Sequence, residues 1–484
     1  MTDVAVYGAT AAGVAAAAAA REAGARTVLV EPGMHVGGMV SGGLSWTDVG
    51  DVRVLGGFAR RFYAAVAERY GAGLWEVKGP EPHVAEEVLT SFLDGADVHL
   101  ATTDVPDAAV YVDASYEGDL MARLGVSYAV GRESRELYGE TWAGRQPAYR
   151  PGKHNFPVTL SPFADDGSLL PFVREPELDE RGWPAERLGE GDGGLQAYGY
   201  RVCLTDRDAN RIPFAEPEGY DASEFELLAR YLAAVDVEPR DLLGLVPDLL
   251  PNGKCDVNSI GPFSLNLLDG SNRAYPDGDD AMRGLVRERH LGYTQRFLFY
   301  LANEAPPHVR AEVARWGLCA DEFTGSDGWP HQLYVRDARR MLGEYVLREP
   351  DLLDGGGHDD VIALGSYNID VREVERTWRY LPEFVATPAV FNEGYLSVAV
   401  PPYAIPYRSL TPRREDAENL LVPVCISASH VAFGSVRMEP TLMLLGHAAG
   451  LAAAQASRRG VAVQDVDVPA LQTSLLDQGQ VLSL

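Results

Sequence analysis

Short apolar runs separated by turn-forming residues open the chain and predict its first elements. Residues 3–7 form an apolar run that ends at Gly8, a pattern typical of a strand buried on both faces. The alanine-rich residues 14–21 predict a helix with a thin packing face, and Thr27–Val30 predicts a second buried strand. A strand, a turn, a helix and a second strand make a βαβ unit, from which nucleotide-binding folds are built.

Further periodic stretches extend this pattern along the chain. Apolar residues at helical spacing predict helices at residues 56–70, 83–95, 223–235, 279–304, 329–347 and 440–456. Apolar runs predict strands at residues 98–101, 109–115, 404–410 and 420–426. Residues 145–220 are rich in proline and glycine and lack a clear period, which indicates long loops.

The predicted helix at residues 329–347 carries three arginines. Arg336 and Arg340 would lie opposite its apolar face, and Arg339 would flank that face. We expect Arg339 and Arg340 to be solvated, and Arg336 to be a candidate contact for an anion. His331 would stand in the loop that enters this helix.

The charge of the chain argues against two classes of partner. Its 484 residues carry a formal net charge of −28, with 70 acidic and 42 basic residues. Such a surface repels nucleic-acid phosphates and anionic lipid. The first predicted strand begins at residue 3 with no basic segment before it, and no apolar run reaches the roughly 20 residues that span a bilayer. We expect a cytosolic (cytoplasmic) protein that binds neither nucleic acid nor membrane.

The apolar content and the cysteines set the remaining limits. A chain with 46% hydrophobic residues can bury a large core, here expected as two domains. The four cysteines are scattered, with neither a C-x-x-C motif nor the spacing of metal ligands. We therefore predict reduced, buried, structural thiols and no metal site.

The turn after the first strand carries a variant of the dinucleotide-binding fingerprint. Gly8 permits the sharp turn and Gly13 lets the helix lie against the strand, while Thr10 replaces the middle glycine. The backbone N–H groups at the helix start, including that of Ala12, are expected to face a pyrophosphate, and the Thr10 hydroxyl could bind phosphate as well. Glu31, at the end of the second strand, is placed to accept hydrogen bonds from both hydroxyls of an adenosine ribose.

A glycine-rich loop follows at residues 32–48. Its glycines allow the backbone to pass close under a flat cofactor, which a flavin needs and a nicotinamide does not. His35 fits a flavin contact, a covalent attachment point or, as we favour, a solvated loop histidine. The cofactor contacts predicted in this loop are Pro32, Gly37, Gly38 and Met39.

The strand at residues 109–115 ends in small and acidic residues. Open α/β sheets bind their ligands at the carboxyl ends of the strands. We therefore predict that Asp113, Ala114 and Ser115 contact the cofactor.

The C-terminal part of the chain predicts the second half of the same site. The strand at residues 420–426 leads into a turn, and proline in the first turn opens the helix at residues 440–456. The start of this helix is expected to stabilise negative charge at the flavin pyrimidine end. A fingerprint completed by a distant strand–turn–helix indicates FAD rather than NAD, and we add Ser435 and Gly446 as cofactor contacts.

Two histidines are the candidate bases. A histidine with its unperturbed pKa of about 6.5 can accept a substrate proton at neutral pH. His430, in the C-terminal turn, is the first choice, and a hydrogen-bonded core histidine is an equally weighted alternative. His331 is the second choice, and Arg437 would help to hold the substrate or the cofactor.

Segments along nearly the whole chain resemble the FAD-dependent oxidoreductases that share a glutathione-reductase-like FAD fold. They include Y-G-A-T-A-A-G, E-P-G-M-H-V-G-G-M and S-A-S-H-V-A-F-G-S-V-R-M-E-P. Some members of this family carry a xanthan-lyase label. The chain departs from the family at Val371-Arg372, where relatives often have Ser-His. If that histidine bears on the substrate, the substrate of this protein differs.

The sequence thus predicts an α/β protein with a Rossmann-like, glutathione-reductase-type FAD-binding domain. We expect that domain at residues 1–145 and 403–484, with an inserted α+β substrate domain at residues 146–402. The expected enzyme is an FAD-dependent dehydrogenase or oxidase that moves a hydride from a CH–OH or CH–NH group of a small polar substrate to flavin N5. O2 is a candidate electron acceptor.

Two other functions stay open at this point. One is a non-redox flavoprotein lyase or hydratase in which FAD is structural, and the other is an NAD-linked dehydrogenase. The sequence leaves open the substrate, the oligomeric state and whether FAD is covalently attached.

Overall fold

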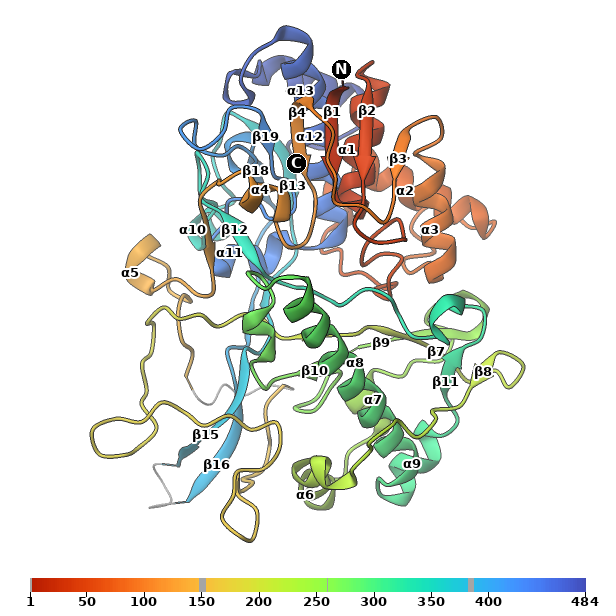
Figure 1. Ribbon diagram of the computed structural model, residues 1–484, viewed down its shortest axis with the longest axis vertical. Helices are drawn as coiled ribbons and strands as arrows, with labels where there is room; N and C mark the ends of the chain where they lie inside the picture. Colours follow the sequence, from red (N-terminus) through yellow and green to blue (C-terminus); the bar gives the residue numbers. More distant parts are fainter. Residues whose placement is uncertain (1, 148–153, 259, 382–386) are drawn as a thin grey trace. The chain divides into compact units, whose positions relative to one another are not determined.

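The computed structural model describes residues 2–147, 154–258, 260–381 and 387–484 (Figure 1). The chain divides into two compact units. Unit 1 comprises Met1–Trp142, Arg336–Asp370 and Ser397–Leu484, and unit 2 comprises Ala143–Val335 and Val371–Leu396. Unit 1 therefore includes residues 336–370, which the sequence analysis placed in the inserted domain.

A five-stranded parallel sheet in the order β19-β4-β1-β2-β3 lies at the centre of unit 1 (Figure 1). Its strands are β1 (Thr2–Tyr7), β2 (Thr27–Val30), β3 (Asp97–His99), β4 (Ala108–Asp113) and β19 (Leu420–Leu421). Tyr7 lies opposite Val30 on one side and Asp113 on the other, so three strands end at the same edge. This sheet confirms the predicted α/β, Rossmann-like fold class.

Helices α1 (Ala11–Glu22) and α12 (Glu439–Arg459) pack directly on each other in unit 1. A Cβ atom on Gly446 would lie 2.1 Å from the backbone oxygen of Ala12, and one on Gly450 would lie 2.2 Å from that of Ala16. Both distances are far below van der Waals contact, so only glycine permits this approach of the two backbones. The alanine run of α1 and the glycines of α12 therefore let a helix from the N-terminal part of the chain pack closely on one from the C-terminal part.

Shorter elements complete unit 1. They are α2 (Gly57–Arg69), α3 (Pro82–Ser91), α4 (Asp119–Arg123), β5 (Tyr128–Val130), α5 (Arg135–Tyr138), β12 (Arg339–Met341), α10 (Glu349–Leu353), β13 (Val361–Gly365), β18 (Tyr403–Pro406), α11 (His430–Val436) and α13 (Val468–Asp477). In the described part of the chain, no helix is long and apolar enough to cross a membrane.

Unit 2 combines a small antiparallel sheet with helices and a separate hairpin. The sheet has the order β8-β11-β7-β9, and strands β15 and β16 form the hairpin. The elements are β6 (Tyr198–Gly199), β7 (Val202–Thr205), β8 (Arg211–Ile212), α6 (Glu226–Ala234), α7 (Pro239–Leu243), β9 (Lys254–Val257), β10 (Asn266–Leu267), α8 (Asp280–Asn303), α9 (Pro307–Val313), β11 (Gly317–Cys319), β15 (Glu375–Tyr380) and β16 (Pro388–Glu393). Strands β14 (Ile369–Val371) and β17 (Leu396–Val398) fall where the chain passes from one unit to the other.

Most of the predicted helices are confirmed within a few residues, but the one at residues 329–347 is wrong. In this stretch Arg339–Met341 forms strand β12, which pairs with β5. The backbone N–H of Met341 donates to the Cys425 oxygen, and that of Leu342 donates to the Ser127 oxygen. Pairing with distant segments therefore overrides the helical spacing of the apolar residues.

The expectation that Arg339 and Arg340 are solvated is also wrong. Arg340 is fully buried, and Arg339 and Arg336 are buried as well. The Arg339 guanidinium lies 2.8 Å from Asp119 and over the ring of Tyr128. Arg339 and Arg340 lie inside unit 1 because they belong to the buried strand β12. Arg336 is the residue at which this segment of unit 1 begins.

The predicted strand at residues 420–426 is shorter than expected. Only Leu420–Leu421 pairs as β19, and the buried residues that follow run as a loop. Backbone groups in this loop bond to residues of the 341–347 stretch instead, as in the bond from the Leu347 N–H to the Ser427 oxygen.

Candidate cofactor and catalytic site

The fingerprint turn of unit 1 has no room for side chains at its two glycines. Gly8 adopts a φ of +94°, and a Cβ atom there would lie 2.7 Å from the backbone nitrogen of Ser115. A Cβ atom on Gly13 would lie 1.8 Å from the Gly8 oxygen. The turn is therefore a backbone-lined cradle at the carboxyl end of β1, next to the end of β4.

Thr10 is the N-cap of α1. Its hydroxyl donates to the Ala114 oxygen at 2.8 Å and accepts from the Gly13 N–H at 3.1 Å. The hydroxyl is thus used inside the protein, and it fastens the turn to β4. The first-turn N–H groups of Ala11 and Ala12 have no acceptor within the helix, so they are the groups suited to a phosphate.

Glu31 links the fingerprint turn to the glycine-rich loop. One carboxylate oxygen accepts from the Ala9 N–H at 2.6 Å, and the other accepts from the Gly33 N–H at 2.6 Å. Burial raises the pKa of Glu31, while these two backbone bonds act to lower it. The carboxylate stands at the end of β2, where the sequence placed it, and the neighbouring Pro32 is exposed.

The glycine-rich loop lies against the fingerprint turn. The Gly37 N–H donates to the Ala9 oxygen at 2.7 Å, and Gly37 forms an isolated bridge with Thr10. Gly37 and Gly38 have φ values of +112° and +56°, which favour glycine. His35 is exposed, with Nδ1 3.2 Å from a Glu86 oxygen, as expected of a solvated loop histidine.

The residues predicted at the end of β4 organise the turn that follows. Asp113 is fully buried and accepts from the backbone N–H and the hydroxyl of Ser115 at 3.0 and 2.7 Å, and from the Met121 N–H at 2.7 Å. Burial raises the pKa of Asp113 to about 6. Ala114 supplies the oxygen that holds Thr10.

A buried carboxyl group that the sequence analysis missed stands at the start of α12. Glu439 Oε1 accepts from the Tyr116 hydroxyl at 2.6 Å, and that hydroxyl accepts from the Met39 N–H at 2.9 Å. Glu439 Oε2 is buried and has no hydrogen-bond partner among the described residues. Burial raises the pKa of Glu439 to about 7. The signal for it was the acid in Arg-Met-Glu-Pro, directly before an otherwise apolar helix.

These features fit a dinucleotide of the FAD type. The turn at Gly8 and Gly13 has room for glycine only, α1 begins beside this turn, and Glu31 follows β2. The loop at Gly37 and Gly38 and the start of α12 are linked through Met39, Tyr116 and Glu439.

The candidate base His430 is the first residue of α11 and is almost fully buried. Its Nδ1 lies 2.8 Å from Asp337 Oδ2, and its backbone N–H donates to Glu133 Oε2 at 2.9 Å. The Arg340 guanidinium lies between the two acids, 2.6 Å from Glu133 and 2.9 Å from Asp337. Neither ring nitrogen of His430 makes a hydrogen bond of good geometry among the described residues, so the Nδ1–Asp337 contact is a close charge contact.

The electrostatics of this cluster keep its acids ionised. Burial works to raise the pKa values of Asp337 and Glu133, but the Arg340 charge, together with contacts from His430, holds both below their usual values. Glu140 is different, since burial raises its pKa to about 7. It accepts from the Ser429 hydroxyl at 2.5 Å and from the Glu349 N–H at 2.8 Å.

The other predicted residues have different surroundings. The Arg437 guanidinium donates to the Asp370 oxygen at 2.8 Å, just before α12. The Ser435 hydroxyl lies 2.6 Å from that of Tyr403 and donates to the Tyr367 oxygen at 2.5 Å. Gly446 packs against α1, as described above. His331 belongs to unit 2, where its ring lies 5.6 Å from that of Phe323.

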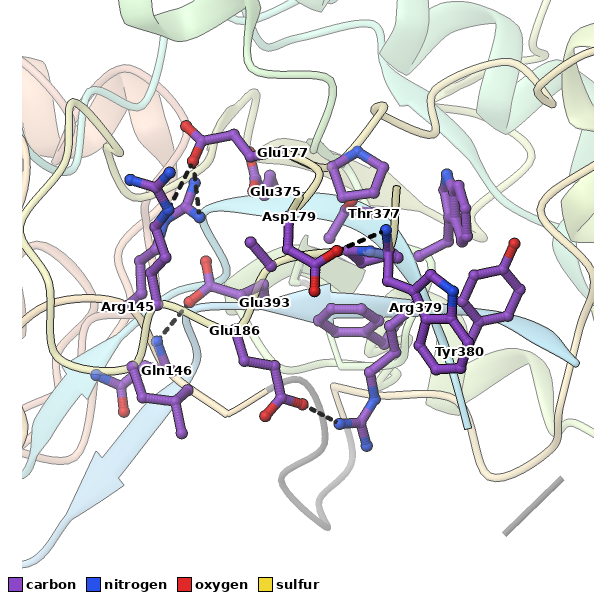
Figure 2. A pocket seen from close by; sticks show the side chains of 18 of the residues that line it. Arg145, Gln146, Glu177, Asp179, Glu186, Glu375, Thr377, Arg379, Tyr380 and Glu393 are labelled. Carbon is purple, nitrogen blue, oxygen red and sulfur yellow. Dashed lines mark hydrogen bonds and ion pairs between the residues drawn. The ribbon is translucent and has the colours of Figure 1, made fainter. Parts of the chain in front are cut away.

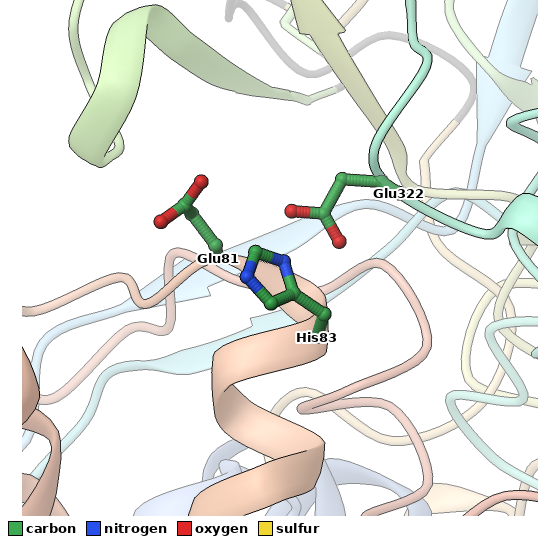
Figure 3. A group of neighbouring side chains, drawn as sticks. All are labelled: Glu81, His83 and Glu322. Carbon is green, nitrogen blue, oxygen red and sulfur yellow. The ribbon is translucent and has the colours of Figure 1, made fainter.

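Figure 3 shows Glu81 and His83 at the start of α3. Glu81 is buried and accepts from the Tyr70 hydroxyl at 2.9 Å, whereas His83 is exposed. Glu322, drawn with them, belongs to unit 2 and lies 2.6 Å from the buried Lys254 Nζ. Each acid has a partner within its own unit, and we assign no ion to these residues.

The sequence profile of the family described as FAD dependent oxidoreductase matches residues 3–106 and 103–475. The chain belongs to this family. The match confirms the family resemblance and FAD as the cofactor, and it leaves the NAD-linked alternative without support. No protein of curated function matches the chain in sequence.

Solved structures match only parts of the chain. OxyS anhydrotetracycline hydroxylase from Streptomyces rimosus is 18% identical, and the match covers 28% of this chain and 35% of that one, with a TM-score of 0.21. THI4 from Thermovibrio ammonificans is 18% identical over 27% of this chain and 64% of its own length, with a TM-score of 0.20. T. acidophilum thioredoxin reductase is 14% identical over 23% of this chain and 34% of its own length, with a TM-score of 0.16. These matches are short and structurally distant. The FAD assignment rests on the family profile and on the residues of the site.

Proposed function

We propose that this FAD-dependent oxidoreductase takes a hydride from a CH–OH or CH–NH group of a small polar substrate, with His430 as the base. When bound, FAD supplies a two-electron acceptor at flavin N5. The protein must then remove the proton of the O–H or N–H group as the hydride leaves, because the product is a carbonyl or an imine. The imidazole of His430 would accept this proton.

The environment of His430 carries the proposal. A carboxylate 2.8 Å from Nδ1 favours a proton on that nitrogen, which leaves the lone pair on Nε2 to accept a substrate proton. Asp337 then stabilises the imidazolium that forms. Arg340 keeps Asp337 ionised and fixed, so that the imidazole is held in one orientation.

Residues at the start of α12 support the same chemistry electrostatically. The N-terminus of α12 and the neighbouring Arg437 supply positive potential that would favour negative charge on a reduced flavin. His331, in unit 2, is the second candidate for the base. Whether electrons then pass to O2, as in an oxidase, or to another acceptor is a property of the reoxidation step.

An anaerobic screen tests the proposal. The purified FAD-bound protein is mixed without oxygen with alcohols, sugars and amines, and the flavin absorbance is followed. Loss of the absorbance band with formation of a carbonyl or imine product supports the proposal. Turnover of a substrate with an unchanged band would establish the lyase or hydratase alternative instead.

A further inference from the structure

A cavity of about 560 Å³ lies in unit 2 between the β15–β16 hairpin and the loop at residues 176–188 (Figure 2). This volume falls in the range of roughly 300–1,000 Å³ that is typical of small-molecule sites. None of the residues assigned above to FAD or to proton transfer lines it. The cavity therefore needs an explanation of its own.

Aromatic side chains form one side of this cavity. The ring of Tyr380 lies 5.1 Å from that of Trp183 and 5.4 Å from that of Trp378, so the three make a continuous strip. Trp183 is 46% exposed. Trp378 is 5% exposed, and its Nε1–H has no hydrogen-bond partner among the described residues. The strip thus offers an apolar surface to the cavity, while the Trp378 Nε1–H is itself buried.

The charged side chains of the cavity wall are paired with one another. Arg379 lies 2.8 Å from Glu186 (Figure 2). Arg181 lies 2.6 Å from Asp179. Glu177 lies near both Arg145 and Arg187, at 3.7 and 3.3 Å. An anionic ligand finds no unpaired guanidinium among these residues.

Two carboxylates face each other across the hairpin at the cavity floor. Glu375 of β15 lies directly opposite Glu393 of β16. Glu375 is 2.7 Å from Arg273, and Glu393 accepts from the Gln146 N–H at 2.7 Å. Both side chains are nearly buried and both accept hydrogen bonds, so a cationic ligand would have to compete with Arg273 and with the Gln146 N–H for them.

These observations select one class of ligand. A neutral molecule can use the remaining donors and acceptors of the paired groups without separating any ion pair. The aromatic strip requires apolar C–H faces, and the surrounding guanidinium and carboxylate groups require hydroxyls. Carbohydrate rings combine both features. We propose that this cavity binds a neutral saccharide.

The proposal concerns binding alone and does not depend on the redox chemistry proposed above. It is tested on the FAD-bound full chain with maltotriose, cellotriose and xylotriose as neutral probes. Glucosamine, glucuronate and benzyl alcohol represent cationic, anionic and neutral aromatic ligands. Saturation-transfer NMR identifies the bound probe, and titration of the tryptophan fluorescence gives its dissociation constant.

The decisive variant is Trp183→Ala, because this residue is 46% exposed and we expect its truncation to leave the fold intact. We expect a neutral trisaccharide to bind, with affinity about tenfold weaker in the variant, as expected for the loss of one aromatic contact. Trp75→Ala is the matched control: this tryptophan packs on Tyr63 in unit 1, outside the cavity, and its loss leaves the affinity unchanged. The flavin spectrum reports folding in each case.

Three outcomes overturn the proposal. The first is that none of the three trisaccharides binds. The second is that a charged or aromatic probe binds more tightly than all of them. The third is that a trisaccharide binds equally well to the wild type and to Trp183→Ala.

Discussion

The fingerprint turn and the His430 cluster are both in unit 1, but they are built in different ways. The turn uses backbone groups and glycines within a few residues of one another, with Gly13 resting on Gly8. The cluster joins side chains from three distant segments, around Glu133, Asp337–Arg340 and His430. The first depends on local shape and the second on long-range charge pairing. A substitution should therefore affect the two regions through different physics.

The largest expected effect comes from emptying the charged cluster. Arg340→Ala leaves the Glu133 and Asp337 carboxylates buried without their cation, which costs about 3–5 kcal/mol of stability. Arg26→Ala is the control, because Arg26 is 68% exposed and water screens its pair with Asp3, so its loss should change the stability far less. Thermal and urea unfolding measure both variants. Equal losses would mean that the buried cluster is not a stabilising unit.

The second test concerns backbone packing. Gly446→Ala places a methyl group against the Ala12 oxygen and should cost about 3 kcal/mol, with loss of bound FAD as α1 shifts. Gly284→Ala, in α8, meets no atom within 4 Å and should stabilise its helix by up to about 1 kcal/mol. Melting curves of the two variants should thus move in opposite directions. A shift in the same direction would contradict the close packing of α1 and α12.

The third test uses the buried acid Glu439, which Tyr116 links to the glycine-rich loop. The pKa of Glu439 is raised from 4.5 to about 7, so the folded protein holds this proton more tightly than the unfolded chain does. The resulting stability, about 3 kcal/mol, is fully present below pH 4.5 and is lost as the pH rises through 7. Glu439→Gln stays neutral and lacks this loss. The melting temperature of the variant relative to that of the wild type should therefore rise between pH 4.5 and 7. A difference in melting temperature that does not change with pH would mean that the carboxyl group is in water.

The smallest expected effect is on cofactor affinity at the fingerprint. Glu31→Ala removes a charged acceptor at the end of β2 and should weaken FAD binding by about 1.5–3 kcal/mol while the protein stays folded. Titration of the apoprotein with FAD gives the affinity. Ser168→Ala, at an exposed hydroxyl of unit 2, should leave it unchanged. Unaltered affinity in Glu31→Ala would mean that the cofactor lies elsewhere.

The same contrast explains what the sequence could predict. The βαβ unit, the glycine positions and Glu31 follow from local rules that relate residue type to backbone shape, and the structure places them as expected. The pattern at residues 329–347 misled, because the apolar spacing of a helix also fits a strand and loop whose partners lie near residues 127 and 425. Local periodicity contains no information about those partners.

The chemistry around the candidate base was beyond the sequence for a related reason. His430 could be singled out from its turn, but its neighbour Asp337 lies far from it in the chain, inside the segment that the sequence predicted to be a helix. Glu439 was visible as an acid in front of an apolar helix. That its Oε2 has no hydrogen-bond partner among the described residues becomes evident only when Tyr116 and Met39 are in place.

The most direct test of the account is the anaerobic rate of flavin reduction in His430→Ala, using whichever substrate the screen identifies. The account predicts that the variant keeps FAD, that reduction slows by roughly 10²–10⁴-fold, and that the rising limb of the pH profile disappears. Asp337→Asn should slow reduction less and change the same limb, because that residue acts through the imidazole, which it orients and whose protonated form it stabilises. Reduction of His430→Ala at the wild-type rate, with early melting or loss of FAD, would show instead that His430 is structural and would move the search for the base to His331.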